Sequence, residues 1–258
     1  MKKIHKTDPI LLGGALRTSI VLVGSGGTGT HMLEGLAMMH KSLVDLGYNG
    51  LTVSVYDNDI VEEHNIGRQQ FGWGDVGSNK ANKAVMRVNR QYGLDWRASP
   101  HSYEFNSTSS HNGNILITAT DSGRSRNLAQ RMFKMCMGSN AIDDITEHRE
   151  HHNLMRTLYW LDLGNNAKSG QFVLGAHDLP TTVDLFGEYD ETDEGPSCSA
   201  AESLRRQDLF VNKSLATMAC HLLWTLFRKG CIDYHGGFMN LETMKMRPIL
   251  IPQPNGPV

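Results

Sequence analysis

The fold is decided by one short stretch, Ser19-Ile20-Val21-Leu22-Val23-Gly24-Ser25-Gly26-Gly27-Thr28-Gly29-Thr30. Its apolar, β-branched half predicts a buried strand, its glycines predict a tight turn, and a helical pattern begins directly after them. Glycine has no Cβ, so this turn can bring backbone N–H groups close to a phosphate, and the helix N-terminus adds donors with a partial positive charge. The stretch therefore predicts nucleotide phosphate binding, although it does not say which nucleotide.

Composition excludes several classes of function. The chain has 258 residues, a formal net charge of -2 and no run of lysine or arginine, which disfavours nucleic acid or an anionic membrane as the main partner. No apolar run approaches the length of a membrane span, and Asp8, Pro9 and Arg17 interrupt the apolar positions near the N-terminus, so we expect no signal peptide and a cytoplasmic protein. The four cysteines form no C-x-x-C pair, so neither a zinc knuckle nor a redox pair is indicated.

The pattern around the glycine turn extends into a repeating α/β unit. Apolar residues recur at helical spacing over 32–46, and a β-rich run over 51–56 ends at Asp57. Strand, glycine turn, helix, strand and acid form the opening unit of a Rossmann-like fold. The further predicted elements are a helix over 80–92, a short strand within 96–105, a strand over 114–120, a helix over 123–137, strands over 157–163 and 171–175, a long helix over 200–229 and a closing hairpin over 234–251.

We therefore expect an α/β fold in a single domain over 1–258, with a central, mostly parallel sheet that continues into a mixed or antiparallel C-terminal half. Residues 1–18 are predicted to form an N-terminal arm that packs on a neighbour. Residues 179–198 are rich in Asp, Glu, Pro and Gly, which predicts a mobile crossing loop.

Polar residues with nucleotide-binding chemistry follow the second strand. Asp57, with Asp59 two residues on, lies where an acid can accept hydrogen bonds from both ribose hydroxyls, although a lone acid there can equally cap a turn. Asn65 and Gln69 can bond phosphate or base, and the Arg68 guanidinium can grip phosphate oxygens in a fork. The alternative for these three is a solvated polar loop.

Two further charged residues complete the set. Lys80 begins a predicted helix and can place a point charge near phosphates, or it is an ordinary surface lysine. Asp121 follows a buried strand, at the edge where open α/β sheets bind ligands, and a carboxylate there can hold magnesium. The alternative for Asp121 is a cap on the next helix, and both roles are compatible.

These motifs, in this order, resemble the ThiF/HesA/MoeB family of ubiquitin-like activating enzymes. The order and spacing of the motifs match across roughly the first half of the chain. The combination is highly specific, because each motif matches a different part of ATP and magnesium. Segments over 160–165, 170–171, 198–202 and 206–208 are in addition similar to the ThiF-like member of the PRTRC gene systems.

The resemblance implies ATP-dependent adenylation of the C-terminal carboxylate of a small ubiquitin-like or sulfur-carrier protein, with release of pyrophosphate. It also implies a homodimer and a conjugating-enzyme-like protein as a candidate acceptor. The resemblance also implies a role for each site residue. ATP is cradled by Gly24, Gly26, Gly27 and Gly29, and its ribose is held by Asp57, with Asp59 and Gln69 nearby. The phosphates are neutralised by Asn65, Arg68 and Lys80, and Mg2+ is held by Asp121. Of these residues, Arg68, Lys80 and Asp121 take part in catalysis.

The chain also departs from the family pattern. Many members carry paired C-x-x-C zinc ligands in the second half, and this chain has none, so we expect no structural zinc of that kind. Family dimers often donate an arginine finger from an N-terminal Arg-Gln stretch. Here only Arg17 lies in the lead-in, and its alternative is a surface residue before a strand.

Cysteine and histidine residues in the second half carry weaker hypotheses. Cys198, in the predicted crossing loop, is the candidate thiol that would attack the acyl-adenylate, and its alternative is a capping or packing cysteine. Cys220 lies in an apolar helical pattern and is predicted to be in the core. His148 and His152 would share a helix face, but crowded histidines without an apolar pattern are more typical of a solvated surface than of a metal site.

Two other classes of function remain open on the sequence. A Rossmann oxidoreductase that uses NAD shares the glycine turn and the acid at Asp57, but it does not need Arg68, Lys80 or a magnesium carboxylate. A non-catalytic nucleotide-binding scaffold would keep the fold and bind a partner, and the complete set of charged residues argues against it.

Overall fold

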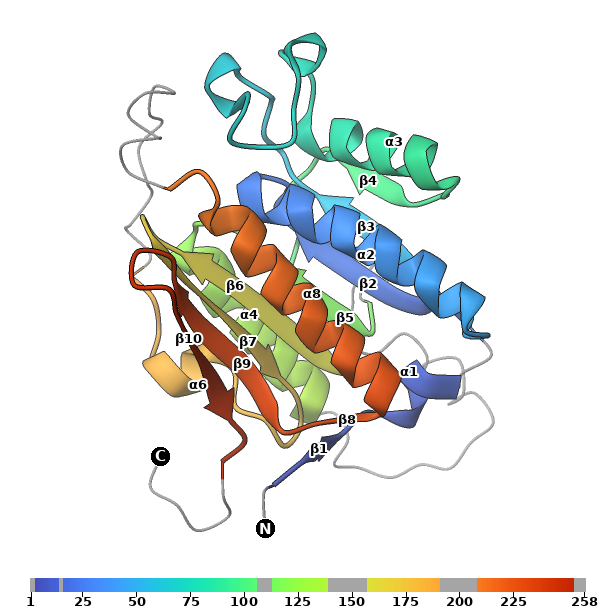
Figure 1. The fold of residues 1–258 in the computed structure, drawn as a ribbon, viewed down its shortest axis with the longest axis vertical. Helices are drawn as coiled ribbons and strands as arrows, with labels where there is room; N and C mark the ends of the chain where they lie inside the picture. The colour runs from blue at the N-terminus through green and yellow to red at the C-terminus, as the bar shows by residue number, and fades with distance from the viewer. Residues whose placement is uncertain (1–2, 14–15, 106–112, 139–156, 191–207, 253–258) are drawn as a thin grey trace.

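The computed structural model describes residues 3–13, 16–105, 113–138, 157–190 and 208–252, and within these ranges an eight-stranded sheet forms the centre of the molecule (Figure 1). Its strand order is β10-β9-β7-β6-β5-β2-β3-β4. The strands are β2 (Thr18–Val23), β3 (Leu51–Tyr56), β4 (Arg97–Ser99), β5 (Ile115–Thr118), β6 (Tyr159–Asn165), β7 (Ser169–Gly175), β9 (Tyr234–Asn240) and β10 (Lys245–Leu250).

The direction of the strands changes at β6. Strands β4, β3, β2, β5 and β6 pair in parallel, whereas β6–β7, β7–β9 and β9–β10 are antiparallel. The predicted mostly parallel sheet with an antiparallel C-terminal half is therefore confirmed. Because the carboxyl ends of parallel strands meet at one edge of a sheet, the segments that follow β2, β3, β5 and β6 gather there.

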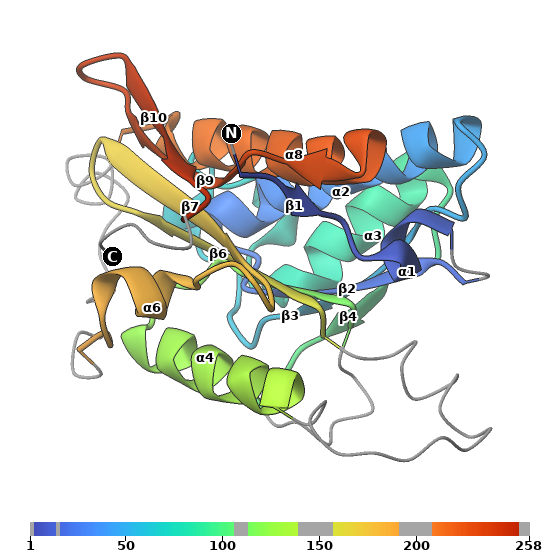
Figure 2. The same ribbon diagram turned by 90° about the horizontal axis from the view of Figure 1, so that it is seen from below.

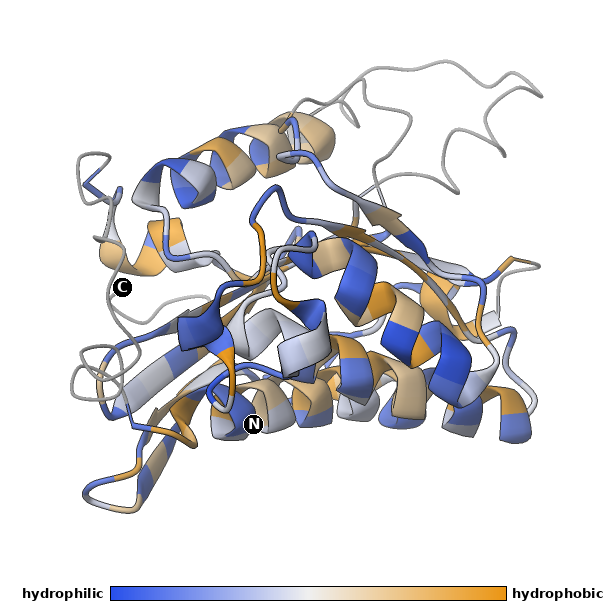
Figure 3. Cartoon of the chain, turned by 90° about the horizontal axis from the view of Figure 1, so that it is seen from above, coloured by the Kyte–Doolittle hydropathy of each residue, from blue (hydrophilic) through white to orange (hydrophobic). Residues whose placement is uncertain are grey.

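Helices cover both faces of the sheet (Figure 2). Helices α2 (Gly27–Asp45), α3 (Lys80–Tyr92) and α8 (Val211–Lys229) lie on one face, and α4 (Gly123–Gly138) and α6 (Thr182–Phe186) lie on the other. Figure 3 shows that apolar and polar residues occur together on these helices. The buried apolar residues of α2, α3 and α8 belong to the core on one face of the sheet, and those of α4 belong to the core on the other. In the described part of the chain, no helix is both long and apolar enough to cross a membrane.

Strand β2 explains why an unbroken apolar run marks the centre of the fold. Ile20 and Leu22 belong to the core under α2 and α8, whereas Val21 and Val23 belong to a second core against α4. Successive side chains of a strand point to opposite faces, so a strand that helices cover on both sides needs apolar residues at every position. All four of these side chains are buried.

Three predicted segments differ from the structure. The helix predicted over 200–229 begins at Val211 in the structure. Residues 208–210 form a turn before it, in which the Phe210 N–H donates to Asp208 Oδ1 at 3.0 Å. Residues 200–207 lie outside the described residues. The predicted crossing loop contains α6, whose start is fixed because Thr181 Oγ1 accepts from the Asp184 N–H at 3.2 Å. The short strand predicted within 96–105 covers only β4.

The N-terminal lead-in packs on its own chain. Strand β1 (His5–Lys6) pairs antiparallel with β8 (Cys231–Ile232), and the short helix α1 (Pro9–Gly13) follows it. His5 is buried, its Nδ1 lies 2.6 Å from Asp178 Oδ1, and burial lowers its pKa. The lead-in ends at residue 17, because Thr18 already belongs to β2.

Candidate nucleotide site

The glycine turn between β2 and α2 is built by close backbone approach. Gly24 has a φ of +93°, and a Cβ on it would lie 2.6 Å from the carbonyl oxygen of Ala119, which follows β5. A Cβ on Gly29, in the first turn of α2, would overlap the carbonyl oxygen of Gly24. These two glycines therefore hold the turn tightly against its own helix and against the neighbouring strand.

Replacing Gly29 with alanine tests this packing. We expect the Gly29→Ala change to lower the free energy of unfolding by about 1–3 kcal/mol, because the added methyl group meets backbone rather than a flexible side chain. Urea denaturation measures the change. Gly74→Ala is the matched control, since no atom lies within 4 Å of a Cβ added there; equal stability of both variants would contradict the packing argument.

The other two glycines of the turn border open space or a side chain. A Cβ on Gly26 would find its nearest neighbour, Gln69 Nε2, at 3.9 Å, and Gly26 lines a cavity of about 360 Å³. A Cβ on Gly27 would overlap the side-chain amide of Asn212, from the first turn of α8. A phosphate can thus approach the backbone closely at Gly26, which is the approach that phosphate-binding glycines provide.

The cavity lies at the carboxyl ends of β2, β3, β5 and β6 and gathers most of the predicted site residues. Gly24, Gly26, Gly27, Asp57, Asp59, Arg68, Gln69, Lys80 and Asp121 all line it. Gly29 and Asn65 do not. Asn65 is buried, and its Oδ1 accepts the Glu62 N–H at 2.9 Å, so its side chain stabilises the loop that carries Arg68.

Asp57 connects the second strand to the glycine turn. Its Oδ2 accepts the N–H of Ser25 at 2.6 Å and the hydroxyl of Ser25 at 2.9 Å, and its Oδ1 accepts the Asp59 N–H at 2.9 Å. The carboxylate therefore stabilises the turn and also lines the cavity. Its predicted bond to a ribose stays a prediction.

Lys80 and Asp59 form an ion pair at the cavity wall. The distance from Lys80 Nζ to Asp59 Oδ2 is 2.8 Å; the lysine side chain is 10% exposed and the aspartate side chain 61% exposed. The Lys80 N–H also donates to the Asp59 carbonyl at 2.9 Å, where α3 begins. Asp59 thus holds the lysine in place, and the ammonium remains close to the space that phosphates would fill.

An aromatic cluster forms another wall, and the sequence analysis missed it. The rings of Tyr56 and Tyr103 lie 4.9 Å apart and those of Tyr103 and Phe105 lie 5.0 Å apart, both edge to face. All three residues line the cavity. Such rings offer an apolar surface to a nucleotide base. Burial raises the pKa of Tyr103, so its hydroxyl stays protonated.

The residues present fit ATP and Mg2+. The cradle at Gly26 would be filled by a Cβ, Arg68 and Lys80 supply two cations, and Asp121 supplies an exposed carboxylate. Among the described residues, no group of three or more His, Cys, Asp or Glu is arranged to hold a metal by itself. A single carboxylate is compatible with Mg2+, since this ion commonly binds through one or two carboxylates together with substrate phosphates and waters.

A buried ion pair between Arg126 and Asp162 supports the wall of a second cavity, which Arg126 lines. Arg126 Nε donates to Asp162 Oδ1 at 3.2 Å, its Nη2 donates to the carbonyls of Thr120 and Leu163 at 2.9 and 3.0 Å, and its guanidinium lies 5.0 Å from the centre of the Tyr189 ring. Burial by itself would lower the pKa of Arg126, but Asp162 and Tyr189 raise it more, so it stays charged.

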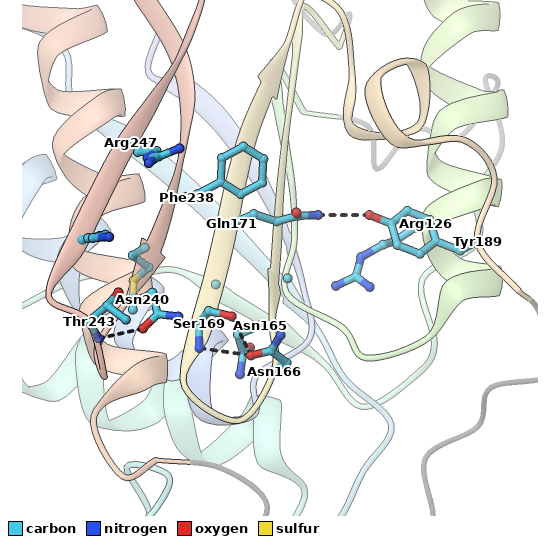
Figure 4. Close-up of a pocket in the computed structure, with 14 residues that line it drawn as sticks. Arg126, Asn165, Asn166, Ser169, Gln171, Tyr189, Phe238, Asn240, Thr243 and Arg247 are labelled. Atoms are coloured by element: carbon cyan, nitrogen blue, oxygen red, sulfur yellow. Dashed lines mark hydrogen bonds between the residues drawn. The ribbon is translucent and has the colours of Figure 1, made fainter.

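The second cavity has a volume of about 550 Å³ and lies over the antiparallel half of the sheet (Figure 4). In Figure 4 the Gln171 amide reaches the Tyr189 hydroxyl, at 3.3 Å, beside Arg126. Lys245 and Arg247 of β10 also line it, and among the described residues no aspartate or glutamate does. The cavity is therefore basic.

Asn165 lies where the two cavities meet, and the sequence did not single it out as a site residue. Of the described residues, it alone lines both. A signal was present, because Asn165 lies two residues after the apolar run at 157–163, close to where Asp57 and Asp121 follow theirs. Asn212, which lines the nucleotide cavity from α8, lacked such a signal because no strand precedes it.

Several other predicted residues lie elsewhere. Arg17 is exposed and pairs with Asp95 at 3.3 Å, at the opposite end of β2 from the glycine turn, so any role as an arginine finger would be toward another subunit. Cys220 packs on α2, its Sγ 3.6 Å from Met32 Sδ, and burial raises the pKa of its thiol to about 12. Cys198, His148 and His152 lie outside the described residues.

Comparisons with known proteins place the chain in context. A family model described as the ThiF family matches residues 14–255. In a comparison with curated proteins, no match was found. Similar solved structures include PaaA (TM-score 0.61, 15% sequence identity, covering 91% of this chain and 64% of PaaA) and Escherichia coli MccB (0.60, 17%, 91% and 62%). The chain thus spans less than two thirds of the length of either protein, and the likeness is one of fold.

Proposed function

Because the chain belongs to the ThiF family, we propose that it uses ATP to adenylate the C-terminal carboxylate of a small ubiquitin-like or sulfur-carrier protein, with release of pyrophosphate. The observation that carries the proposal is the composition of the nucleotide cavity. One cavity combines a glycine cradle, the carboxylates of Asp57 and Asp121, and the cations of Arg68 and Lys80. A dinucleotide site does not require that pairing of cations with a magnesium carboxylate.

The protein's part in this reaction is positioning and charge stabilisation. Asp57 is already fixed by Ser25 and would hold the ribose, while Arg68 and Lys80 would neutralise the charge that builds up on the phosphates. Asp121 would hold Mg2+, which when bound supplies further positive charge to the phosphate oxygens. The rings of Tyr56 and Tyr103 would exclude water from one side of the nucleotide.

The second cavity supplies a place for the protein substrate. It adjoins the nucleotide cavity at Asn165, so a chain terminus bound there would end beside the phosphates. Escherichia coli MccB, which shares the fold, has been solved with ATP and with MccA. We propose that the C-terminal segment of the substrate protein binds in the second cavity, along β7 and β9 and beside Lys245 and Arg247.

The charge of the second cavity makes the proposal testable. If the terminal segment carries an acidic side chain, the double change Lys245→Glu with Arg247→Glu should raise the KM for the partner protein by about tenfold or more and leave the KM for ATP unchanged, because each cation–carboxylate contact is worth on the order of 1 kcal/mol at an exposed site. Steady-state pyrophosphate exchange measures both constants. Lys229→Glu, at the end of α8, is the matched control; an unchanged KM for the partner in the double variant would contradict an acidic terminus.

Pyrophosphate exchange also tests the activity itself. The protein is incubated with ATP, Mg2+, labelled pyrophosphate and candidate ubiquitin-like or sulfur-carrier proteins, and incorporation of label into ATP is expected only when a partner with a free terminal carboxylate is present. Tight binding of NAD without exchange for any partner would overturn the proposal in favour of a Rossmann oxidoreductase.

A further inference from the structure

Asn165 occupies the position where the two reactants of the proposed reaction would meet. It is the last residue of β6, in antiparallel register with Gly170 of β7, and it lines both the nucleotide cavity and the second cavity. Figure 4 shows its side chain beside Asn166, at the turn end of the β6–β7 hairpin. A residue at this point can contact both a nucleotide and a chain terminus.

The side chain of Asn165 is held from one side. The Thr28 hydroxyl lies 2.9 Å from Asn212 Oδ1 and 3.3 Å from Asn165 Oδ1, so the two amide oxygens share its single proton. Thr28 and Asn212 are both buried, in the first turns of α2 and α8. Three elements that are far apart in the sequence thus meet at the Asn165 amide.

The amide nitrogen of Asn165 is a hydrogen-bond donor without an acceptor among the described residues. Asn165 Nδ2 is enclosed by the protein and makes no hydrogen bond to the described residues. An enclosed N–H group without a partner costs about 1–3 kcal/mol, so such a group marks a place where a ligand or an ordered water supplies the acceptor. Asn165 lines two cavities, and a molecule bound in either of them can supply that acceptor.

We propose that Asn165 Nδ2 donates a hydrogen bond to the acyl oxygen of the substrate's terminal carboxyl group, an inference that rests on the proposed adenylation. In that step one carboxylate oxygen forms a bond to the α-phosphorus, the bond from that phosphorus to the bridging oxygen breaks, and pyrophosphate leaves with the electron pair. The second carboxyl oxygen becomes the acyl carbonyl oxygen. Asn165 would orient it and keep the first oxygen directed at phosphorus.

The test uses small ligands and needs no identified partner. An N-acetyl sulfamoyl adenosine, which mimics an acyl-adenylate and resists hydrolysis, has the acyl oxygen and no ammonium group; AMP lacks the acyl oxygen. Asn165→Asp keeps an acceptor for Thr28 but removes the donor. We expect this change to weaken binding of the acyl mimic by about tenfold more than binding of AMP, as measured by titration calorimetry.

A repulsion between the new carboxylate and the ligand phosphate does not imitate this result, because it acts at least as strongly on AMP. Asn165→Ala, which adds no charge, should show the same selective loss. Asn82→Asp is the control, since Asn82 is exposed on α3 and lines neither cavity; its affinities should equal those of the wild type.

The outcomes separate the two proposals. A selective loss for the acyl mimic in both Asn165 variants supports the inference. Equal losses for both ligands, or no loss, overturn it while leaving adenylation intact. A wild-type protein that binds neither AMP nor the acyl mimic overturns the proposed function, and this inference falls with it.

Discussion

Replacing Lys80 with methionine is expected to lower the rate of pyrophosphate exchange by about 10²–10³-fold, which is the usual cost of removing one preorganised donor from a site where charge develops. The Lys80 ammonium is nearly enclosed, is held by Asp59 at 2.8 Å and lies on the wall of the nucleotide cavity. Methionine matches the lysine side chain as far as Cε and removes the terminal ammonium with its charge and donors.

The fold should survive the Lys80→Met change, because the Asp59 carboxylate left behind is 61% exposed and water can solvate it. Urea denaturation checks this point. Lys83→Met is the matched control: Lys83 lies one turn further along α3, pairs with Asp75 at 3.4 Å and does not line the cavity. Comparable exchange rates in the two variants would show that Lys80 does not act on phosphate.

Replacing Arg126 with methionine is expected to have the largest effect on stability, a loss of about 3–5 kcal/mol in the free energy of unfolding. The Asp162 carboxylate is 1% exposed, and the change would leave it without its cationic partner. The carbonyls of Thr120 and Leu163 would lose their donor as well. Urea denaturation measures the loss, and tryptophan fluorescence follows it through Trp160, whose Nε1 donates to Thr118 beside Asp162.

A second variant separates the buried charge from simple loss of packing. Combining Arg126→Met with Asp162→Asn removes both charges, while the amide oxygen at 162 still accepts the Thr118 hydroxyl, at 2.6 Å in the wild type. The double variant should therefore recover much of the lost stability. A double variant that is less stable than Arg126→Met would mean that the guanidinium acts through its packing on Tyr189 instead.

Local signals allowed much of the fold to be predicted. Helix α3 has the predicted bounds because both of its ends are encoded nearby: the Asn79 side chain accepts the Asn82 N–H at 3.0 Å, and Gly93, with a φ of +66°, ends the helix. The start of α8 was predicted wrongly because the spacing of apolar residues carries no information about the turn at Asp208. There the Asp208 side chain accepts the Phe210 N–H, a bond that favours a turn over a helix.

Some residues of the candidate site were likewise predictable from the local sequence, and others were not. Asp57 and Asp121 were predictable because each directly follows an apolar strand, and the structure brings both to one cavity. Tyr103 and Phe105 were not, since they meet Tyr56 only after the chain has passed through α3 and β4, and nothing near them in the sequence indicates that contact. Asn65 shows the converse: its side chain has nucleotide-binding chemistry, yet a local loop contact occupies its oxygen.

The hairpin between β6 and β7 makes the fold easy to redesign. Residues 166–168 connect the two strands, they are exposed, and β6 ends beside the nucleotide cavity while β7 continues along the second cavity. An insertion at this turn would therefore lengthen one rim of the second cavity without shifting the parallel strands that carry the nucleotide residues. Under the proposed function, libraries that vary this turn are therefore a way to search for variants that accept other partner proteins.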